Sequence, residues 1–251
     1  MRTATLACLT AAATIVVACA SPDPGAASRD SAGARARIET IVASADRSDA
    51  DRKNDVRRKP VELLAFTGVR PGMTVLDVSS GGGYTTELLA RAVAPGGRVY
   101  AQTPRPPSPA LAARLQKPVA ADVTSVVRPF ESAPPPDAAG RLDLVTLIFN
   151  YHDMGHLGVD RARLNAAVFA ALKPGGSYVI ADHSGRPGTG ISESGTLHRV
   201  EEALVKREVE AAGFRLAAEG TFLRNPEDPR DRQEPDPPQP KDEFVLRFVK
   251  P

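Results

Sequence analysis

Cysteine and aromatic residues are scarce in this chain, and their scarcity excludes several classes of protein. Only Cys8 and Cys19 occur among the 251 residues, and Cys8 lies in an apolar N-terminal segment that we expect to be removed. The mature chain then cannot form an internal disulfide, which excludes a disulfide scaffold and a cysteine-based zinc site. The four Tyr and eight Phe are scattered and too few for a base-stacking surface.

An excess of charge is also lacking. The 32 basic and 30 acidic residues give a formal net charge of +2, and no compact Lys/Arg patch occurs. We therefore expect no nucleic-acid partner. The length of 251 residues is sufficient for one α/β domain with a complete core.

The longest apolar run, residues 4–18, is too short to span a bilayer as a mature helix. It follows Arg2 and ends directly before Cys19, which resembles a bacterial lipoprotein signal. The resemblance implies that residues 1–19 are a signal peptide, that Cys19 is lipidated, and that the exported protein stays on the periplasmic side of a membrane through this lipid anchor alone. Two alternatives remain: a secretory signal cleaved near Ala20, giving a soluble periplasmic protein, and a misassigned start codon in a cytosolic protein.

The rest of the chain divides into a tether and a folded domain. Residues 20–48 are rich in Pro, Gly, Ala and Ser, which predicts a flexible tether with a short helix over 38–45. The domain then covers 49–251 and begins with a highly charged stretch, 49–59, that we expect to be solvated.

From residue 60 onward, helical and extended patterns alternate. The pattern predicts helices over 61–66, 85–93, 110–116, 161–172 and 197–212, and strands over 74–78, 98–101, 142–149, 177–181, 214–217 and 244–249, with weaker strand signals at 119–121 and 126–127. This order predicts an α/β fold with a doubly wound, mostly parallel sheet whose last strand is antiparallel.

The most informative motif is a glycine-rich turn between a predicted strand and a predicted helix. The strand ends in Asp77-Val78, and Gly81, Gly82 and Gly83 follow. Glycine lets the backbone approach a ligand where a Cβ would collide. Open α/β sheets bind ligands at the carboxyl ends of their strands, so the turn predicts a ligand site of the nucleotide type.

Four later motifs make the turn part of a larger pattern. They are Pro95-Gly96-Gly97-Arg98, Leu142-Asp143-Leu144-Val145, Leu172-Lys173-Pro174-Gly175-Gly176 and Ala211-Ala212-Gly213-Phe214. In this order and spacing the chain resembles a class I S-adenosylmethionine-dependent methyltransferase, and residues 150–153, 181–183 and 197–199 resemble a bacterial group of predicted methyltransferases. The resemblance implies a Rossmann-like sheet, S-adenosylmethionine as methyl donor, and an unidentified small molecule as methyl acceptor.

The resemblance also implies which residues bind the donor: Asp77, Ser79, Gly81, Gly83, Tyr84, Gln102, Asp122 and Asn150. Two positions depart from the family pattern. Ser79 stands where glycine is usual, and Gln102 stands where an acid usually binds the ribose hydroxyls. An amide offers no charged acceptor, so we expect weaker ribose binding.

These departures and the export signal leave open an alternative, an exported non-catalytic binding or interaction protein on a methyltransferase scaffold. A dehydrogenase matches less well, because the glycines lack the wider G-x-G-x-x-G spacing and no acid ends the second strand.

The histidines, His152, His156, His183 and His198, all lie in the second half of the chain. His152-Asp153 and Asp182-His183 each follow a predicted core strand, so both pairs should lie at the carboxyl edge beside the glycine turn. We predict that His152, Asp153 and His183 are catalytic, with an imidazole acting as base toward a hydroxyl or amine acceptor.

Structural explanations of the same residues remain open. Asn150 and Asp153 can cap the turn after their strand, His156 can be a loop residue, and His198 can belong to a solvated helix start. His152, Asp153, Asp182 and His183 are ligand types for divalent ions, but they lack a characteristic spacing, so we predict no metal site.

Overall fold

The computed structural model describes residues 1, 24–235 and 238–251. The predicted signal peptide and Cys19 lie outside this part of the chain, so cleavage and lipidation stay predictions. Within it, no helix is both long enough and apolar enough to cross a membrane.

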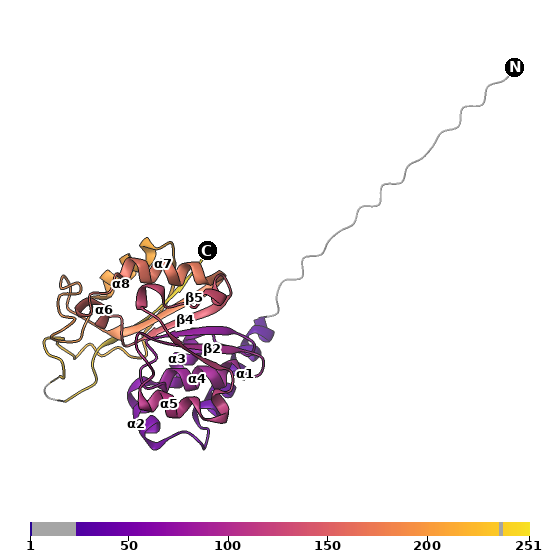
Figure 1. The fold of residues 1–251 in the computed structure, drawn as a ribbon, viewed down its shortest axis with the longest axis horizontal. Coiled ribbons are helices and arrows are strands. Elements are labelled where there is room, and N and C mark those ends of the chain that lie inside the picture. Colours follow the sequence, from indigo (N-terminus) through magenta and orange to yellow (C-terminus); the bar gives the residue numbers. More distant parts are fainter. Residues whose placement is uncertain (2–23, 236–237) are drawn as a thin grey trace.

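Seven strands form one sheet (Figure 1). They are β1 (Thr74–Val78), β2 (Arg98–Thr103), β3 (Val123–Val127), β4 (Leu142–Ile148), β5 (Leu172–His183), β6 (Arg215–Gly220) and β7 (Glu243–Val249). Their order is β3-β2-β1-β4-β5-β7-β6, and only β7 runs antiparallel to its neighbours. The predicted fold class is confirmed. Because the order reverses between β1 and β4, the carboxyl ends of these strands form the crevice where such sheets bind ligands.

Helices cover both faces of the sheet (Figure 1). They are α1 (Pro24–Val42), α2 (Asp49–Arg58), α3 (Pro60–Thr67), α4 (Tyr84–Val93), α5 (Pro109–Leu115), α6 (Asp153–His156), α7 (Arg161–Ala171) and α8 (Glu202–Ala211). One apolar core joins α7 and α8 to side chains such as Leu76 and Phe244. The other joins α1, α3 and α4 to the opposite face, around Val75 and Val179. Burial of both sheet faces explains the nearly continuous apolar run of β4.

The N-terminal boundary of the domain differs from the prediction. A single helix, α1, begins at Pro24 and replaces most of the tether expected over residues 20–48. Ile38 and Ile41 are buried and pack in the core with Leu63 and Leu88. The domain therefore begins with α1, before residue 49, because two isoleucines one turn apart anchor this helix on α3 and α4.

The charged stretch expected to be solvated is helix α2, which is solvated on one side, where Asp49 and Lys53 are exposed, and turns Asp51 and Asp55 toward other parts of the domain. Asp51 is 3% exposed and lies 2.5 Å from the guanidinium of Arg114. Arg47 lies 2.7 Å from Asp55, which also accepts a hydrogen bond from the Tyr84 hydroxyl. Ion pairs of this kind let a strongly polar helix pack against the domain.

Two other boundaries matter for the site. The helix predicted from residue 197 begins at Glu202, because His198 has a φ of 52° and Val200 forms a β-bridge with Ser184. The strand signal at 119–121 was wrong: Pro118–Ala120 is a 3-10 turn, and β3 starts only at Val123.

Candidate functional site at the carboxyl edge of the sheet

The glycine turn ties together the carboxyl ends of three strands. The backbone N–H of Ser79 donates to Oε1 of Gln102 at 3.0 Å, and its hydroxyl donates to Oδ1 of Asn150 at 3.0 Å. Ser79 has a φ of 57°, and Gly81 and Gly83 have φ of 56° and 82°. The serine thus adopts the left-handed backbone that glycine favours, at a cost of about 1 kcal/mol.

Asp77, at the end of β1, connects this turn to the neighbouring elements through hydrogen bonds. Its side chain is fully buried and accepts hydrogen bonds from the hydroxyls of Thr86, at 2.6 Å, and Thr146, at 2.8 Å. Burial raises its pKa to about 6, although the two threonine hydrogen bonds oppose the shift. Asp77 therefore joins β1 to α4 and β4 and also lines the cavity at the turn.

Two residues predicted to bind the donor lie differently from the prediction. Gln102 is completely buried; its carbonyl accepts from Ser79, and its amide donates to the carbonyl of Arg128 at 2.7 Å. Both ends of this amide therefore make hydrogen bonds within the protein and neither is free for a ribose. In addition, Gln102 is not the last residue of β2, which ends at Thr103. Asp122 lies before β3, at the amino edge of the parallel sheet and away from the glycine turn. Asp122 lies there because β3 begins at Val123, after this residue, and the strand signal at 119–121 was wrong.

A small cavity of about 80 Å³ adjoins the turn, and Asp77, Ser79, Gly81, Tyr84 and Asn150 all line it, together with Arg58 at the end of α2. The Arg58 guanidinium stacks at 5.0 Å from the rings of both Tyr84 and Phe149. Its Nε is buried without a hydrogen-bond partner, and no carboxylate of the described residues lies within ion-pair distance. Desolvation and nearby Arg57 lower its pKa. Sequence analysis missed this cation, because nothing in residues 49–59 distinguished one basic residue from its neighbours.

The predicted catalytic residues meet at the same edge. Nδ1 of His152 lies 2.6 Å from the fully buried carboxylate of Asp182, which also accepts the backbone N–H groups of His152 and His183. Nε2 of His152 lies 3.1 Å from Oδ1 of Asp153. Burial disfavours the imidazolium, but the charge of Asp182 and the hydrogen bond to Asp153 prevail and raise the pKa of His152 to about 10. The two carboxylates thus favour the charged imidazole, the form that cannot accept a proton, and the catalytic role of His152 stays a prediction.

His183 ends β5 and forms a second pair. Its Nδ1 lies 2.9 Å from Oε1 of Glu243, at the start of β7, and Arg57 lies 2.7 Å from the same oxygen. Its ring stacks on Phe149, with 5.4 Å between centroids. The Glu243 partner was not predicted, since the chain reaches β7 sixty residues later and only the antiparallel pairing brings Glu243 opposite His183.

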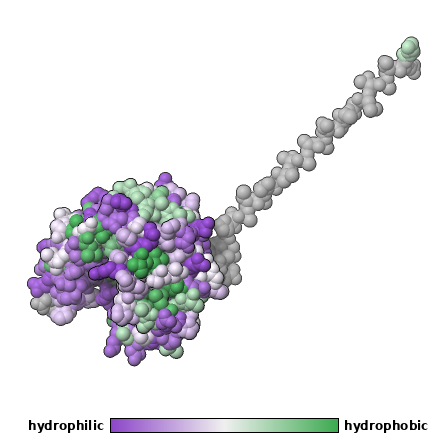
Figure 2. Space-filling model, viewed as in Figure 1, coloured by the Kyte–Doolittle hydropathy of each residue, from purple (hydrophilic) through white to green (hydrophobic). Residues whose placement is uncertain are grey.

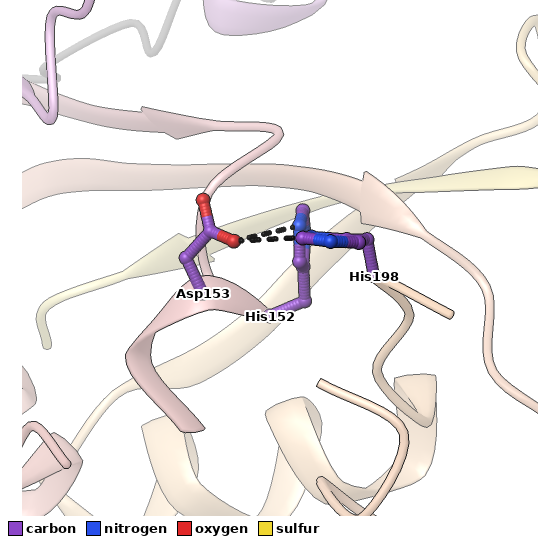
Figure 3. A group of neighbouring side chains, drawn as sticks. All are labelled: His152, Asp153 and His198. Carbon is purple, nitrogen blue, oxygen red and sulfur yellow. Dashed lines mark ion pairs between the residues drawn. The ribbon is translucent and has the colours of Figure 1, made fainter. Parts of the chain in front are cut away.

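The two remaining histidines also belong to this edge. Nδ1 of His198 lies 3.5 Å from Oδ1 of Asp153 (Figure 3). Nε2 of His156 lies 3.9 Å from the same oxygen. His156 is the last residue of helix α6 and not a loop residue, and His198 lies in the loop before α8 and not at a helix start. A signal in the sequence was available: all the histidines fall within 152–198.

Larger hollows flank the site. One of about 480 Å³ borders the His183–Glu243 pair, and the basic side chains in its lining, Arg57, Lys59, Arg224 and Lys241, outnumber the acidic ones, Glu227 and Glu243. Figure 2 shows the molecule hollowed between the part carrying α2 and α5 and the loops before β7. Another cavity, of about 360 Å³ beside Lys173, lies at the opposite edge of the sheet, away from the glycine turn.

Comparisons with known proteins agree with this architecture. Residues 75–176 match the Methyltransf_25 family, described as a methyltransferase domain. The protein-L-isoaspartate O-methyltransferase of Aeropyrum pernix is 54% identical over 39 residues, which are 16% of this chain and 15% of that protein.

Two solved structures share the fold. A SAM dependent methyltransferase from Aquifex aeolicus is 19% identical, with a TM-score of 0.57, over 82% of this chain and all of its own. The geranyl diphosphate C-methyltransferase of Streptomyces coelicolor A3(2), in complex with Mg²⁺, geranyl diphosphate and S-adenosylhomocysteine, is 15% identical, with a TM-score of 0.59, over 84% of this chain and 88% of its own. The chain therefore has the fold of class I S-adenosylmethionine-dependent methyltransferases, with a methyltransferase-domain match at residues 75–176, and these findings support S-adenosylmethionine as the methyl donor.

Proposed function

We propose that this protein transfers a methyl group from S-adenosylmethionine to a small molecule. The observation that carries the proposal is the cavity shared by the glycine turn and the half-buried guanidinium of Arg58, whose Nε is buried without a hydrogen-bond partner. A desolvated cation without a carboxylate partner is costly unless a ligand anion completes it. The donor carries a carboxylate at its methionine end, and Arg58 and the turn would hold that end.

Binding the whole donor requires the cleft to open. About 80 Å³ has room for only a few water molecules. Helix α2 covers this cavity, and ion pairs such as Asp51–Arg114 hold it in place. We infer that α2 moves outward when the donor enters, and that Arg58 then draws it back over the ligand.

The acceptor would approach from the side of His183. Methyl transfer is an in-line displacement that depends mainly on orientation, and a base is needed when the acceptor is a hydroxyl or amine. His183 would be that base, and Oε1 of Glu243 lies 2.9 Å from its Nδ1, although the two atoms do not form a hydrogen bond. The basic lining of the 480 Å³ hollow favours an acceptor that carries negative charge.

Export as a lipoprotein through Cys19 remains part of the proposal, supported by the sequence pattern before this cysteine. The non-catalytic alternative on the same scaffold also stays open, since the buried Gln102 leaves the ribose without the charged acceptor usual in the family.

Calorimetric titration of the purified chain with S-adenosylmethionine and S-adenosylhomocysteine tests the proposal. We expect both to bind, and Arg58→Ala to weaken binding by more than about tenfold, as loss of a buried charge-assisted contact does. Lys53→Ala, an exposed change on the same helix, should leave the affinity unchanged. Absence of binding at millimolar ligand would rule the proposal out.

A further inference from the structure

Three imidazole nitrogens surround one carboxylate oxygen at the carboxyl edge of the sheet. Oδ1 of Asp153 lies 3.1 Å from Nε2 of His152, 3.5 Å from Nδ1 of His198 and 3.9 Å from Nε2 of His156. Figure 3 shows that the side chains of Asp153, His152 and His198 converge from α6 and from the loop before α8. Imidazole together with carboxylate is a donor set that suits first-row transition metals.

The spacing of these atoms fits a metal ion. Such ions lie about 2.1 Å from imidazole nitrogen and carboxylate oxygen. Two ligands at angles between about 90° and 110° are then about 3.0–3.4 Å apart. The Asp153–His152 separation of 3.1 Å lies in this range and the Asp153–His198 separation of 3.5 Å exceeds it by 0.1 Å, and the ligand atoms of the three residues all lie within 4.8 Å of one another.

We propose that His152, Asp153 and His198 bind a divalent first-row transition-metal ion, with His156 as a further ligand. The sequence analysis considered Asp182 and His183 in place of His198 and His156, and predicted no metal site. Asp182 supports His152 from behind, and His183 pairs with Glu243 instead.

Groups outside the ligand set hold His152 and His156 in a ligating orientation. The buried carboxylate of Asp182 engages Nδ1 of His152 at 2.6 Å, so that Nε2 points toward Asp153. The hydroxyl of Ser194 engages Nδ1 of His156 at 3.0 Å, which turns Nε2 the same way. A carboxylate or hydroxyl behind a ligating histidine is the usual support of metal sites in proteins. His198 is held in a left-handed backbone at φ 52°, a strain that recurs at functional sites.

The cluster is open on one side. The side chains of Asp153, His156 and His198 are 27%, 35% and 37% exposed, whereas that of His152 is 5% exposed. Three or four protein ligands with an open side are typical of a metal that binds a further molecule rather than a closed structural site.

The position of this open side suggests what the metal would bind, a step that rests on the proposed function. His152 is two residues from Asn150, which contacts Ser79 of the donor turn. A hydroxyl-bearing acceptor bound to the metal would lose its proton more readily. Its oxygen would form a bond to the donor methyl carbon while the carbon–sulfur bond breaks and its electron pair stays on sulfur.

Titration of the full chain with metal alone tests the site independently of methyl transfer. The EDTA-treated protein is titrated with Zn²⁺ by calorimetry and with Co²⁺ by visible absorption, and we expect one ion per chain with a ligand-field spectrum of nitrogen and oxygen ligands. Mg²⁺ prefers oxygen ligands and should not compete. His198→Ala and Asp153→Ala should each weaken Zn²⁺ binding by more than about tenfold.

His183→Gln is the matched control, since this histidine lies 5.4 Å from the His152 ring but outside the ligand set. It should leave Zn²⁺ affinity unchanged. If any variant fails to fold by circular dichroism, His156→Ala, at an exposed ligand, replaces it and should weaken binding. Absence of Zn²⁺ binding by the wild-type chain, or equal binding by the ligand variants, would overturn the proposal. Binding of S-adenosylmethionine to the metal-free protein tests the proposed function separately from the metal site.

Discussion

Replacement of Asp77 by asparagine should change how the stability of this protein depends on pH. Asp77 is 2% exposed, and burial raises its pKa from 3.8 to about 6. A raised carboxyl pKa means that the folded state holds the proton more tightly than the unfolded state. The stabilisation is thus complete below pH 3.8 and is lost as pH rises through about 6.

The size of this effect follows from the shift. One pKa unit corresponds to about 1.4 kcal/mol, so the change from 3.8 to about 6 amounts to about 3 kcal/mol. The asparagine side chain of the variant cannot titrate, and the free energy of unfolding of Asp77→Asn minus that of wild type should therefore rise by about 3 kcal/mol between about pH 3 and pH 8. The amide between Thr86 and Thr146 has its own cost in stability, but this cost does not depend on pH. It therefore does not contribute to the rise of the difference with pH.

Urea denaturation of both proteins at half-unit pH steps measures the difference directly, because all other titrating groups are common to the two chains. Thr146→Val is a useful control: it removes a hydrogen bond that lowers the pKa of Asp77, and should steepen the dependence. A difference that stays flat over this pH range, or that falls, would refute this account of Asp77.

Three further changes test other parts of the structure. Arg199→Met should cost about 3–5 kcal/mol in urea denaturation, because it leaves Asp228 buried without the guanidinium 2.9 Å away; a loss below about 1 kcal/mol would contradict the buried pair. Gly83→Ala should cost about 1–2 kcal/mol and weaken donor binding in calorimetry, since this position has a φ of 82° and a Cβ would lie 2.8 Å from Cδ of Arg114; unchanged affinity would show that the turn tolerates the shift. Phe244→Ala should cost about 3–5 kcal/mol in thermal or urea unfolding by leaving a cavity in the core, whereas a loss below about 1 kcal/mol would mean that the core collapses around it.

The sheet was predictable because its signals are local. Strand β1 has the predicted bounds, and the glycine turn, the buried run of β4 and the antiparallel β7 were all expected from periodicity and turn residues. Each of these elements is determined by residues within a few positions of itself.

The errors arose where distant contacts decide the outcome. Helix α2 looked solvated because its partners Arg114 and Tyr84 come from other helices. The family resemblance assigned Asp122 to the site, but the strand signal just before it was wrong, and β3 begins after Asp122, which places this residue at the other edge of the sheet. His198 was placed in a helix, and only its left-handed backbone brings it to Asp153.

The most direct test of the central claim is calorimetric binding of S-adenosylhomocysteine by the wild-type chain beside Gly81→Val. A branched side chain is strained at the φ of 56° that residue 81 adopts in the donor turn. The account predicts saturable binding of one ligand per wild-type chain and its loss in the folded variant. Equal binding by both proteins, or no binding by the wild type at millimolar ligand, would contradict it.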